Sequence, residues 1–331
     1  MKVRVAVIPI LALLLTQVAV SESAPQVTDD PQIPVRDATA ASAFKQGLLQ
    51  RIARQEAVAR QAESVHANII ALSKIYFQLG LLYQDAAQWA RAEAALQHTI
   101  SLLRNPPGQA GDLATAISQL GSLHVLMGKL RDSEKEVVEA LKLRQEVGDE
   151  LSIARSWNDL AILYLTEQKY AKAKDFAQHA EAVFAGNAGA KVMDRIIVRS
   201  TLSEALCYLK QCPSAIPMLK EVLDEANATM HPGDFPIGLS NFLLGYAYWK
   251  SGNMPAAGEY LERGTTLMNT QLGWGHPAYL KALTCYAQYL RESRQLEAAN
   301  VIERKIRQAE AVVDVHTLQT AQGMFRFDGL H

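Results

Sequence analysis

The stretch from Arg155 to Phe184 reads RSWNDLAILYLTEQKYAKAKDFAQHAEAVF, and it decides the fold. Its apolar and small residues recur three and four positions apart, as on one face of an α-helix. The first set is Trp157, Leu160, Ala161 and Tyr164, and the second is Tyr170, Ala173, Ala177 and Ala180. The polar segment 166–169 between them is only long enough for a tight turn. The stretch therefore predicts two antiparallel helices, an αα-hairpin.

The same hairpin recurs along the chain in a constant register. Ala161 has small counterparts at Gly80, Gly121, Ser203, Gly245 and Ala287, so successive copies lie 41, 40, 42, 42 and 42 residues apart. A second small residue keeps step on the returning helix, as Ala92, Ser133, Ala173, Ala215, Ala257 and Ala299. Glycine inside a helix costs about 1 kcal/mol relative to alanine. Three glycines in one register therefore indicate that the paired helices approach closely there.

The order W-x-x-L-A-x-x-Y, followed by a small residue on the second helix, resembles the tetratricopeptide repeat. The period, together with the linker Leu272-Gly273-Trp274-Gly275-His276-Pro277, is similar to the longer repeats of kinesin light chains and many bacterial proteins. The resemblance implies an all-α, right-handed α-solenoid of six hairpins over residues 67–310. In this family the first helices of successive hairpins line a concave groove that binds peptides or folded partners.

The segments outside the array have different compositions. Lys2 and Arg4 precede an uncharged apolar run from Val5 to Val20 with small residues at its end, which predicts a cleaved signal peptide over residues 1–21. An uncleaved membrane anchor is the alternative. Residues 22–39 are rich in proline and polar residues and are expected to be a flexible lead-in. Residues 40–66 are helical in pattern and form a capping helix or a degenerate repeat, and residues 311–331 form a C-terminal tail.

The charge and the hydropathy of the repeats indicate neither general nucleic-acid binding nor a membrane span. The net charge of −1 gives no general attraction to nucleic acid or to an anionic membrane. No repeat contains the roughly eighteen unbroken apolar residues of a spanning helix. The predicted signal peptide leads us to expect an exported protein, periplasmic or secreted, whose contact with a membrane depends on an uncleaved signal segment.

Motifs for catalysis, metals and cofactors are missing from the sequence. No two of the eight histidines share a helix face at ligand spacing, and there is no H-E-x-x-H or C-x-x-C. His124 occupies the position of Tyr83 and Tyr164, which favours a satisfied core histidine over a ligand. The segment 186–191 is glycine-rich but lacks the spacing of a phosphate loop. We predict no enzyme activity, no metal and no cofactor.

The chain has three cysteines, Cys207, Cys212 and Cys285. In an oxidising compartment Cys207 and Cys212 could bridge across the turn of the fourth hairpin. The odd third cysteine argues against a disulfide framework, and two idle thiols are the favoured interpretation.

One set of aromatic residues suggests a binding surface. Phe242, Tyr246 and Trp249 lie at i, i+4 and i+7, offset from the core stripe of the fifth hairpin. If they face the groove, they form an exposed apolar patch of the kind that marks binding sites. The alternative is that they are buried against the next hairpin or the tail. Groove positions of the neighbouring hairpins, assigned from the same resemblance, are Glu204, Tyr208, Thr284, Gln288 and Arg291.

The groove lacks the lysine–asparagine clamp with which some family members hold a free C-terminus, because Phe77 and Leu81 stand at its positions in the first hairpin. An extended or helical segment with apolar anchors fits better. The sequence thus predicts a non-catalytic scaffold or adaptor that binds a protein or peptide partner. The alternative is an accessory or sensor subunit that presents a substrate to a separate enzyme.

Overall fold

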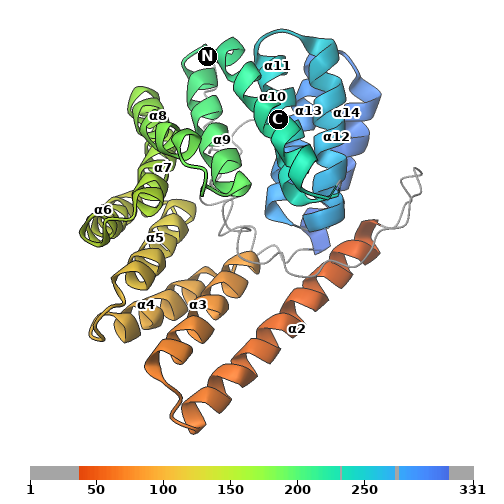
Figure 1. Ribbon diagram of the computed structural model, residues 1–331. Coiled ribbons are helices and arrows are strands. Elements are labelled where there is room, and N and C mark those ends of the chain that lie inside the picture. Colours follow the sequence, from red (N-terminus) through yellow and green to blue (C-terminus); the bar gives the residue numbers. More distant parts are fainter. Residues whose placement is uncertain (1–36, 232, 273–275, 313–331) are drawn as a thin grey trace. The chain divides into compact units, whose positions relative to one another are not determined.

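The computed structural model describes residues 37–231, 233–272 and 276–312. Within these ranges there are thirteen α-helices and no strand, as Figure 1 shows. They are α2 (Asp37–Ser64), α3 (Ile69–Asp85), α4 (Trp89–Leu103), α5 (Ala110–Leu126), α6 (Leu130–Val147), α7 (Glu150–Thr166), α8 (Tyr170–Gly186), α9 (Val192–Tyr208), α10 (Cys212–Thr229), α11 (Phe235–Lys250), α12 (Met254–Leu272), α13 (Pro277–Glu292) and α14 (Leu296–Val312).

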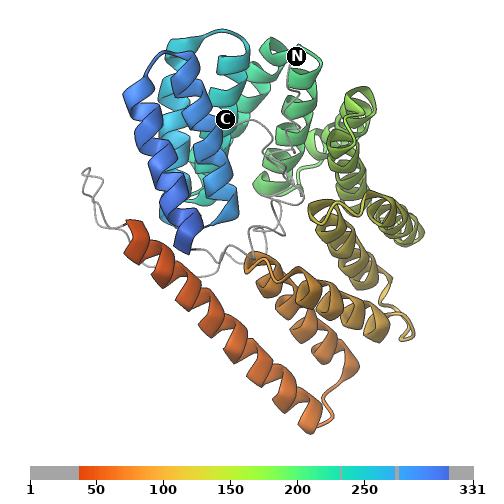
Figure 2. The same cartoon turned by 180° about the vertical axis from the view of Figure 1, so that it is seen from behind.

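Six pairs of consecutive helices form the predicted hairpins. They are α3–α4, α5–α6, α7–α8, α9–α10, α11–α12 and α13–α14, numbered 1 to 6 below. Each pair is joined by only a few residues, so its helices run antiparallel (Figure 2). The all-α fold class predicted from the sequence is confirmed.

The hairpins divide between two compact units, each described here by itself. Unit 1 holds hairpins 1 to 3 within residues 46–190, and there α4 packs on α5, and α6 on α7. Unit 2 holds hairpins 4 to 6 from residue 191 onward, and there α10 packs on α11, α12 on α13, and α9 on α11. In both units each hairpin covers the apolar face of the next one.

The small residues on the returning helices lie at the closest contacts of the hairpins. Ala92, Ser133, Ala173, Ala215, Ala257 and Ala299 are all 0% exposed. The glycines on the first helices, Gly80, Gly121 and Gly245, lie against Leu96, Val137 and Leu261 of the returning helices. A Cβ atom built on Gly245 would lie 2.6 Å from the backbone nitrogen of Leu261, where no side chain fits without movement. The predicted close helix approach is confirmed, most strictly in hairpin 5.

The turn inside each hairpin repeats as regularly as the core. One residue in each turn has a left-handed backbone: Ala87, Gly128, Gln168, Lys210, Gly252 and Arg294, with φ between 53° and 85°. These positions are again 41, 40, 42, 42 and 42 residues apart. The left-handed residue reverses the chain in the shortest possible link. Glycine fills only two of the six turns, so the other four accept a conformation that costs about 1 kcal/mol or more.

The helix predicted over residues 40–66 is present as α2. It runs from Asp37 to Ser64, and its side chains bond to α3: Gln55 Nε2 donates to the backbone oxygen of Ile75 at 3.3 Å, and Tyr76 donates to Glu63. The predicted signal peptide, most of the lead-in and nearly all of the C-terminal tail lie outside the described residues. In the part of the chain that is described, no helix is long and apolar enough to cross a membrane.

Candidate functional site

The three aromatic residues predicted to line an exposed groove are buried. Phe242 is 0%, Tyr246 8% and Trp249 4% exposed, so the expectation of an exposed apolar patch is wrong. One reason is that the backbone of Phe242 lies against Gly264 of α12: a Cβ atom on that glycine would be 2.5 Å from the nitrogen of Phe242. The predicted alternative, burial against the following hairpin, describes Trp249.

Trp249 joins hairpin 5 to hairpin 6. Its indole packs edge-on against Tyr289 of α13, with ring centroids 6.1 Å apart, and also edge-on against Tyr246 at 5.9 Å. Its Nε1–H donates to Oε2 of Glu292 at 2.8 Å, which satisfies the buried polar atom of the ring. Trp249 is therefore an anchor between α11 and α13.

Two charged groups contact this buried indole, one at its face and one at its edge. The ammonium of Lys250 is 3.3 Å from the centroid of the Trp249 ring and 5.5 Å from that of Tyr246, a cation–π contact to two rings. Glu292 accepts from the indole and also from Nε2 of Gln288 at 3.3 Å. Lys250, Gln288 and Glu292 are exposed, so a charged and polar rim surrounds the buried aromatics. We call Trp249, Lys250, Gln288 and Glu292 the tryptophan rim.

The other predicted groove residues occupy different environments. Glu204 is 3% exposed and Tyr208 is half-buried, both on α9, and Thr284 donates to the backbone oxygen of Leu280. Arg291 forms an ion pair with Glu303 of α14 at 2.6 Å, within its own hairpin. Of the predicted set, the structure thus brings Trp249, Tyr246 and Gln288 into one cluster, while Arg291 is engaged by α14. A role in binding stays a prediction for all of them.

The sequence analysis missed four residues of this region: Lys250, Lys281, Cys285 and Glu292. On α13, Lys281, Cys285, Gln288 and Glu292 follow one another at steps of four, three and four, the spacing of one helix face. This stripe shares Gln288 with the predicted series, and its members Cys285 and Glu292 each follow a predicted residue, Thr284 and Arg291, by one position. The helical period alone could have found it, since Gln288 belongs to both series.

Electrostatics on this face do not favour nucleophilic chemistry. Burial raises the pKa of the Cys285 thiol to about 11, although the charges of Lys281 and Lys250 act to lower it. Burial lowers the pKa of Lys281, with the charges of Cys285 and Glu204 acting to raise it. A thiol with such a raised pKa stays protonated at neutral pH and is a poor nucleophile.

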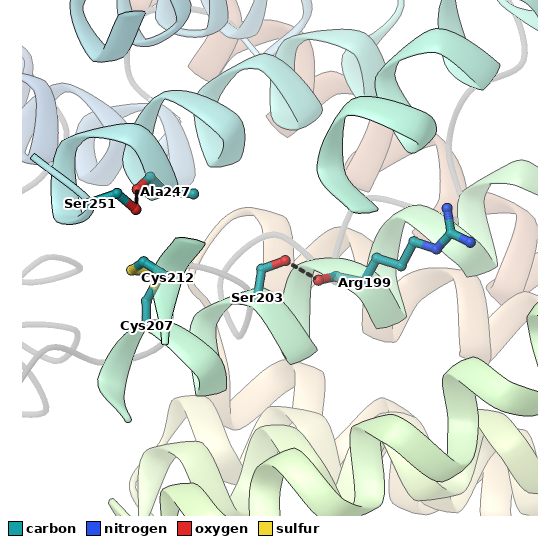
Figure 3. The surroundings of a disulfide bond; sticks show 6 residues. All are labelled: Arg199, Ser203, Cys207, Cys212, Ala247 and Ser251. Atoms are coloured by element: carbon teal, nitrogen blue, oxygen red, sulfur yellow. Dashed lines mark hydrogen bonds between the residues drawn. A yellow bond between two sulfur atoms is a disulfide. The ribbon is translucent and has the colours of Figure 1, made fainter. Parts of the chain in front are cut away.

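Cys207 and Cys212 form a disulfide bond, shown in Figure 3, so the favoured interpretation of two idle thiols is wrong. Cys207 lies in the last turn of α9 and Cys212 begins α10. The left-handed Lys210 between them folds the link so tightly that the two Cα atoms are 4.2 Å apart. Ala247 of α11 and Ser251, which follows α11, belong to the surroundings of the bridge.

His124 is a buried and fully bonded histidine, as predicted. It is 4% exposed, and its two ring nitrogens contact carboxylates of Glu136 at 2.8 Å and Glu93 at 3.0 Å. Among the described residues, no cluster of three or more histidine, cysteine or acidic side chains could hold a metal ion.

Comparison with known proteins identifies the repeats. A family model described as tetratricopeptide repeat matches residues 112–186, which span α5 to α8, and a second model of the same description matches residues 240–267. No curated protein matches the chain by sequence.

Solved structures resemble the chain in fold. The Rap conjugation gene regulator of plasmid pLS20, in complex with the Phr* peptide, is 12% identical with a TM-score of 0.63, covering 94% of this chain and 83% of that one. A Rap protein complexed with competence and sporulation factor is 13% identical with a TM-score of 0.61, covering 86% and 82%. BtubC (BKLC) from P. vanneervenii is 20% identical with a TM-score of 0.51, covering 72% and 94%.

The recurring hairpins, their small contact residues and these matches agree with one another. The chain therefore contains tetratricopeptide repeats and has an all-α fold of the α-solenoid type.

Proposed function

We propose that this protein is a non-catalytic scaffold that binds a peptide or protein partner through the first helices of its hairpins. Two structural neighbours are complexes, one with the Phr* peptide and one with competence and sporulation factor. At 12% and 13% identity they share only the fold, so the residues of this chain have to supply the argument.

The observation that carries the proposal is the construction of the tryptophan rim. A buried Trp249 holds the Lys250 ammonium at 3.3 Å on its face and the Glu292 carboxylate at 2.8 Å on its edge. Both charged residues are exposed, yet neither has to be ordered when a partner arrives, because the indole already fixes them. Preorganisation of this kind lowers the entropic cost of binding. The rim offers a cation, an anion and an amide side by side, which suits a polar segment carrying both charges.

Selection of peptides from a random display library tests the proposal. The bait is the chain from residue 22, without the predicted signal peptide, compared with a Lys250→Ala/Gln288→Ala variant that removes two exposed rim groups and leaves the buried indole in place. A matched control is Glu259→Ala/Glu262→Ala, two exposed positions on α12. Circular dichroism verifies that all three proteins are folded.

We expect the wild-type chain and the α12 control to enrich the same peptides, and the rim variant to lose them. Equal enrichment by the rim variant would show that the rim does not contribute to peptide binding. Failure of the wild-type chain to enrich any peptide would count against peptide binding itself.

We further propose that the chain is exported. The motivation is the predicted signal peptide over residues 1–21, and the Cys207–Cys212 disulfide suits an oxidising compartment. Expression with the natural N-terminus, followed by N-terminal sequencing of the product, tests this proposal. A product that begins after Ser21 outside the cytoplasm supports it, and an intact product that stays inside the cell contradicts it.

A further inference from the structure

The first three hairpins share a contact made by the residue three positions after the small core residue. This residue is Tyr83, His124 and Tyr164 in hairpins 1, 2 and 3. Tyr83 donates to Glu56 of α2 at 2.8 Å, and His124 contacts Glu93 of α4 at 3.0 Å. Each contact ties the first helix of a hairpin to the helix that precedes it in the chain.

Tyr164 repeats the arrangement in hairpin 3. Its pKa is raised by burial and by the charge and hydrogen bond of Glu134 on α6. The three positions thus form one series, in which an aromatic ring reaches back to a glutamate on the preceding helix.

A basic residue completes the first two contacts. Arg91 pairs with Glu56 at 2.6 Å and Lys129 pairs with Glu93 at 2.8 Å. In hairpin 3, Lys169 lies 5.5 Å from the ring centroid of Tyr164. The first two junctions therefore join a ring, a carboxylate and a cation, whereas Lys169 pairs with Glu167 of its own turn. The junction into hairpin 2 differs from the other two because its ring is an imidazole.

Only the imidazole has carboxylates on two sides. Nε2 faces Glu93 of α4, and Nδ1 faces Glu136 of α6 at 2.8 Å. A neutral imidazole carries one N–H, so one of its nitrogens would present a lone pair to a carboxylate. The imidazolium donates from both nitrogens and satisfies both partners. The geometry therefore suits the doubly protonated ring.

The two carboxylates around His124 favour the same protonated state. The facing groups are Glu93 from α4, Glu136 from α6, and Lys129 from the turn, which pairs with Glu93. Burial acts to lower the pKa of His124, but the hydrogen bonds and charges of Glu136 and Glu93 outweigh burial and raise the pKa above its usual value. The tyrosine at the junction into hairpin 1 behaves differently, because burial and Glu56 raise the pKa of Tyr83 to about 12.

We propose that His124 is a proton-controlled joint in unit 1: its doubly protonated ring bonds to Glu136 within hairpin 2 and to Glu93 of hairpin 1, and loss of one proton loosens this junction between the two hairpins. The neighbouring tyrosine junctions keep their protons throughout the physiological range. Hairpins 1 to 3 therefore present one adjustable contact between two fixed ones.

The sign of the pH effect follows from the raised pKa. Stabilisation by the His124 contacts is complete below the unfolded-state pKa of about 6.5 and is lost as the pH rises through the higher folded-state pKa. The junction is thus tight in mildly acidic solution and loosens on the alkaline side.

Titration of the wild-type chain is the direct test. Histidine-selective isotope labelling follows the eight histidines by NMR between pH 5 and 9, and the His124 signal is the one missing from the spectra of His124→Gln and His124→Tyr. We expect the His124 midpoint to lie above that of an unperturbed histidine, about 6.5. A midpoint at or below that value would overturn the proposal.

A second test exchanges the residues of equivalent junctions. His124→Tyr converts the joint into the neighbouring type, and Tyr164→His provides the reverse change in unit 1. Hydrogen exchange of peptides from α4 to α6, corrected for the intrinsic pH dependence, reports the opening of the junction in the full chain. We expect wild-type protection to fall relative to His124→Tyr as the pH rises from 6 to 9.

A constant ratio between the two proteins across that range would refute the joint. The comparison also removes the effect of Asp85, a carboxyl whose pKa burial raises to about 7 and which is present in both chains. If His124→Tyr does not fold, the same measurement with His124→Gln replaces it.

Discussion

Substitution of Gly245 by alanine tests whether close helix contact is the reason for the small residue in hairpin 5. A Cβ atom at this position would lie 2.6 Å from the backbone nitrogen of Leu261, 2.8 Å from its Cγ and 3.0 Å from the carbonyl carbon of Tyr260. Two of these three atoms belong to the backbone of α12, which a rotamer change cannot move. The helices have to separate, so the hairpin loses contact along its length.

The expected change in the stability of hairpin 5 is the balance of two effects. Alanine gains about 1 kcal/mol over glycine in a helix interior. Overpacking of a well-filled core costs about 1–3 kcal/mol, and backbone obstruction favours the upper end of that range. We therefore expect Gly245→Ala to destabilise hairpin 5 by about 2 kcal/mol, which is about a thirtyfold increase in its open population.

Hydrogen exchange of peptides from α11 and α12 is the appropriate assay, because repeat arrays open locally and need not unfold in two states. Gly121→Ala is the matched variant in hairpin 2: the only contact of its Cβ closer than 3.4 Å would be with the Cγ2 atom of Val137 at 3.0 Å, a side chain that can shift, and the backbone oxygen of Ser133 would lie at 3.5 Å. We expect Gly121→Ala to lower protection of α5 and α6 much less than Gly245→Ala lowers that of α11 and α12. Undiminished protection in Gly245→Ala would refute the role of close approach.

Three further predictions follow from individual contacts. Cys207→Ser/Cys212→Ser should destabilise the α9–α10 hairpin by about 2 kcal/mol in urea denaturation, because the unfolded chain is no longer constrained by the closed loop. Thiol titration of the unfolded, oxidised wild-type chain should detect Cys285 alone. Gln168→Gly should stabilise hairpin 3 by up to about 1 kcal/mol in the same assay, because glycine adopts its left-handed backbone without strain; a loss of stability would contradict this. His276 is buried, accepts a hydrogen bond from the Ala278 amide at 3.1 Å and has its pKa lowered by burial to about 4. The free energy of unfolding should therefore fall as the pH drops from about 6.5 toward 4. The variant His276→Asn keeps an N-cap acceptor and should reduce this loss in acid titrations followed by circular dichroism.

The sequence alone determined the repeat register. A step of 40 to 42 residues locates every small contact residue, and all six on the returning helices are completely buried. The register can be recognised because each hairpin repeats the same contact between residues at a fixed separation, and such a contact selects small residues at a regular interval in the sequence. The burial of His124 followed from the same register, since it stands at a tyrosine position.

The environment of α11 was decided only by the tertiary structure. The offset stripe of Phe242, Tyr246 and Trp249 is a real helix face, but a period does not say what lies opposite that face. Trp249 is covered by Tyr289, forty residues later in the chain, and Phe242 is covered by the backbone near Gly264. The residues that cover this face come from α12 and from α13, and the period of α11 does not specify them.

For the disulfide, too, the sequence suggested a possibility that only the tertiary structure decided. Its two cysteines were evident as a possible pair, and the count of three argued against them. The disulfide depends on the left-handed backbone at Lys210, which brings the Cα atoms of Cys207 and Cys212 to a distance of 4.2 Å. Local periodicity thus determined the helices and their pairing in this protein, while the partners of each helix face and of each cysteine were decided by three-dimensional packing.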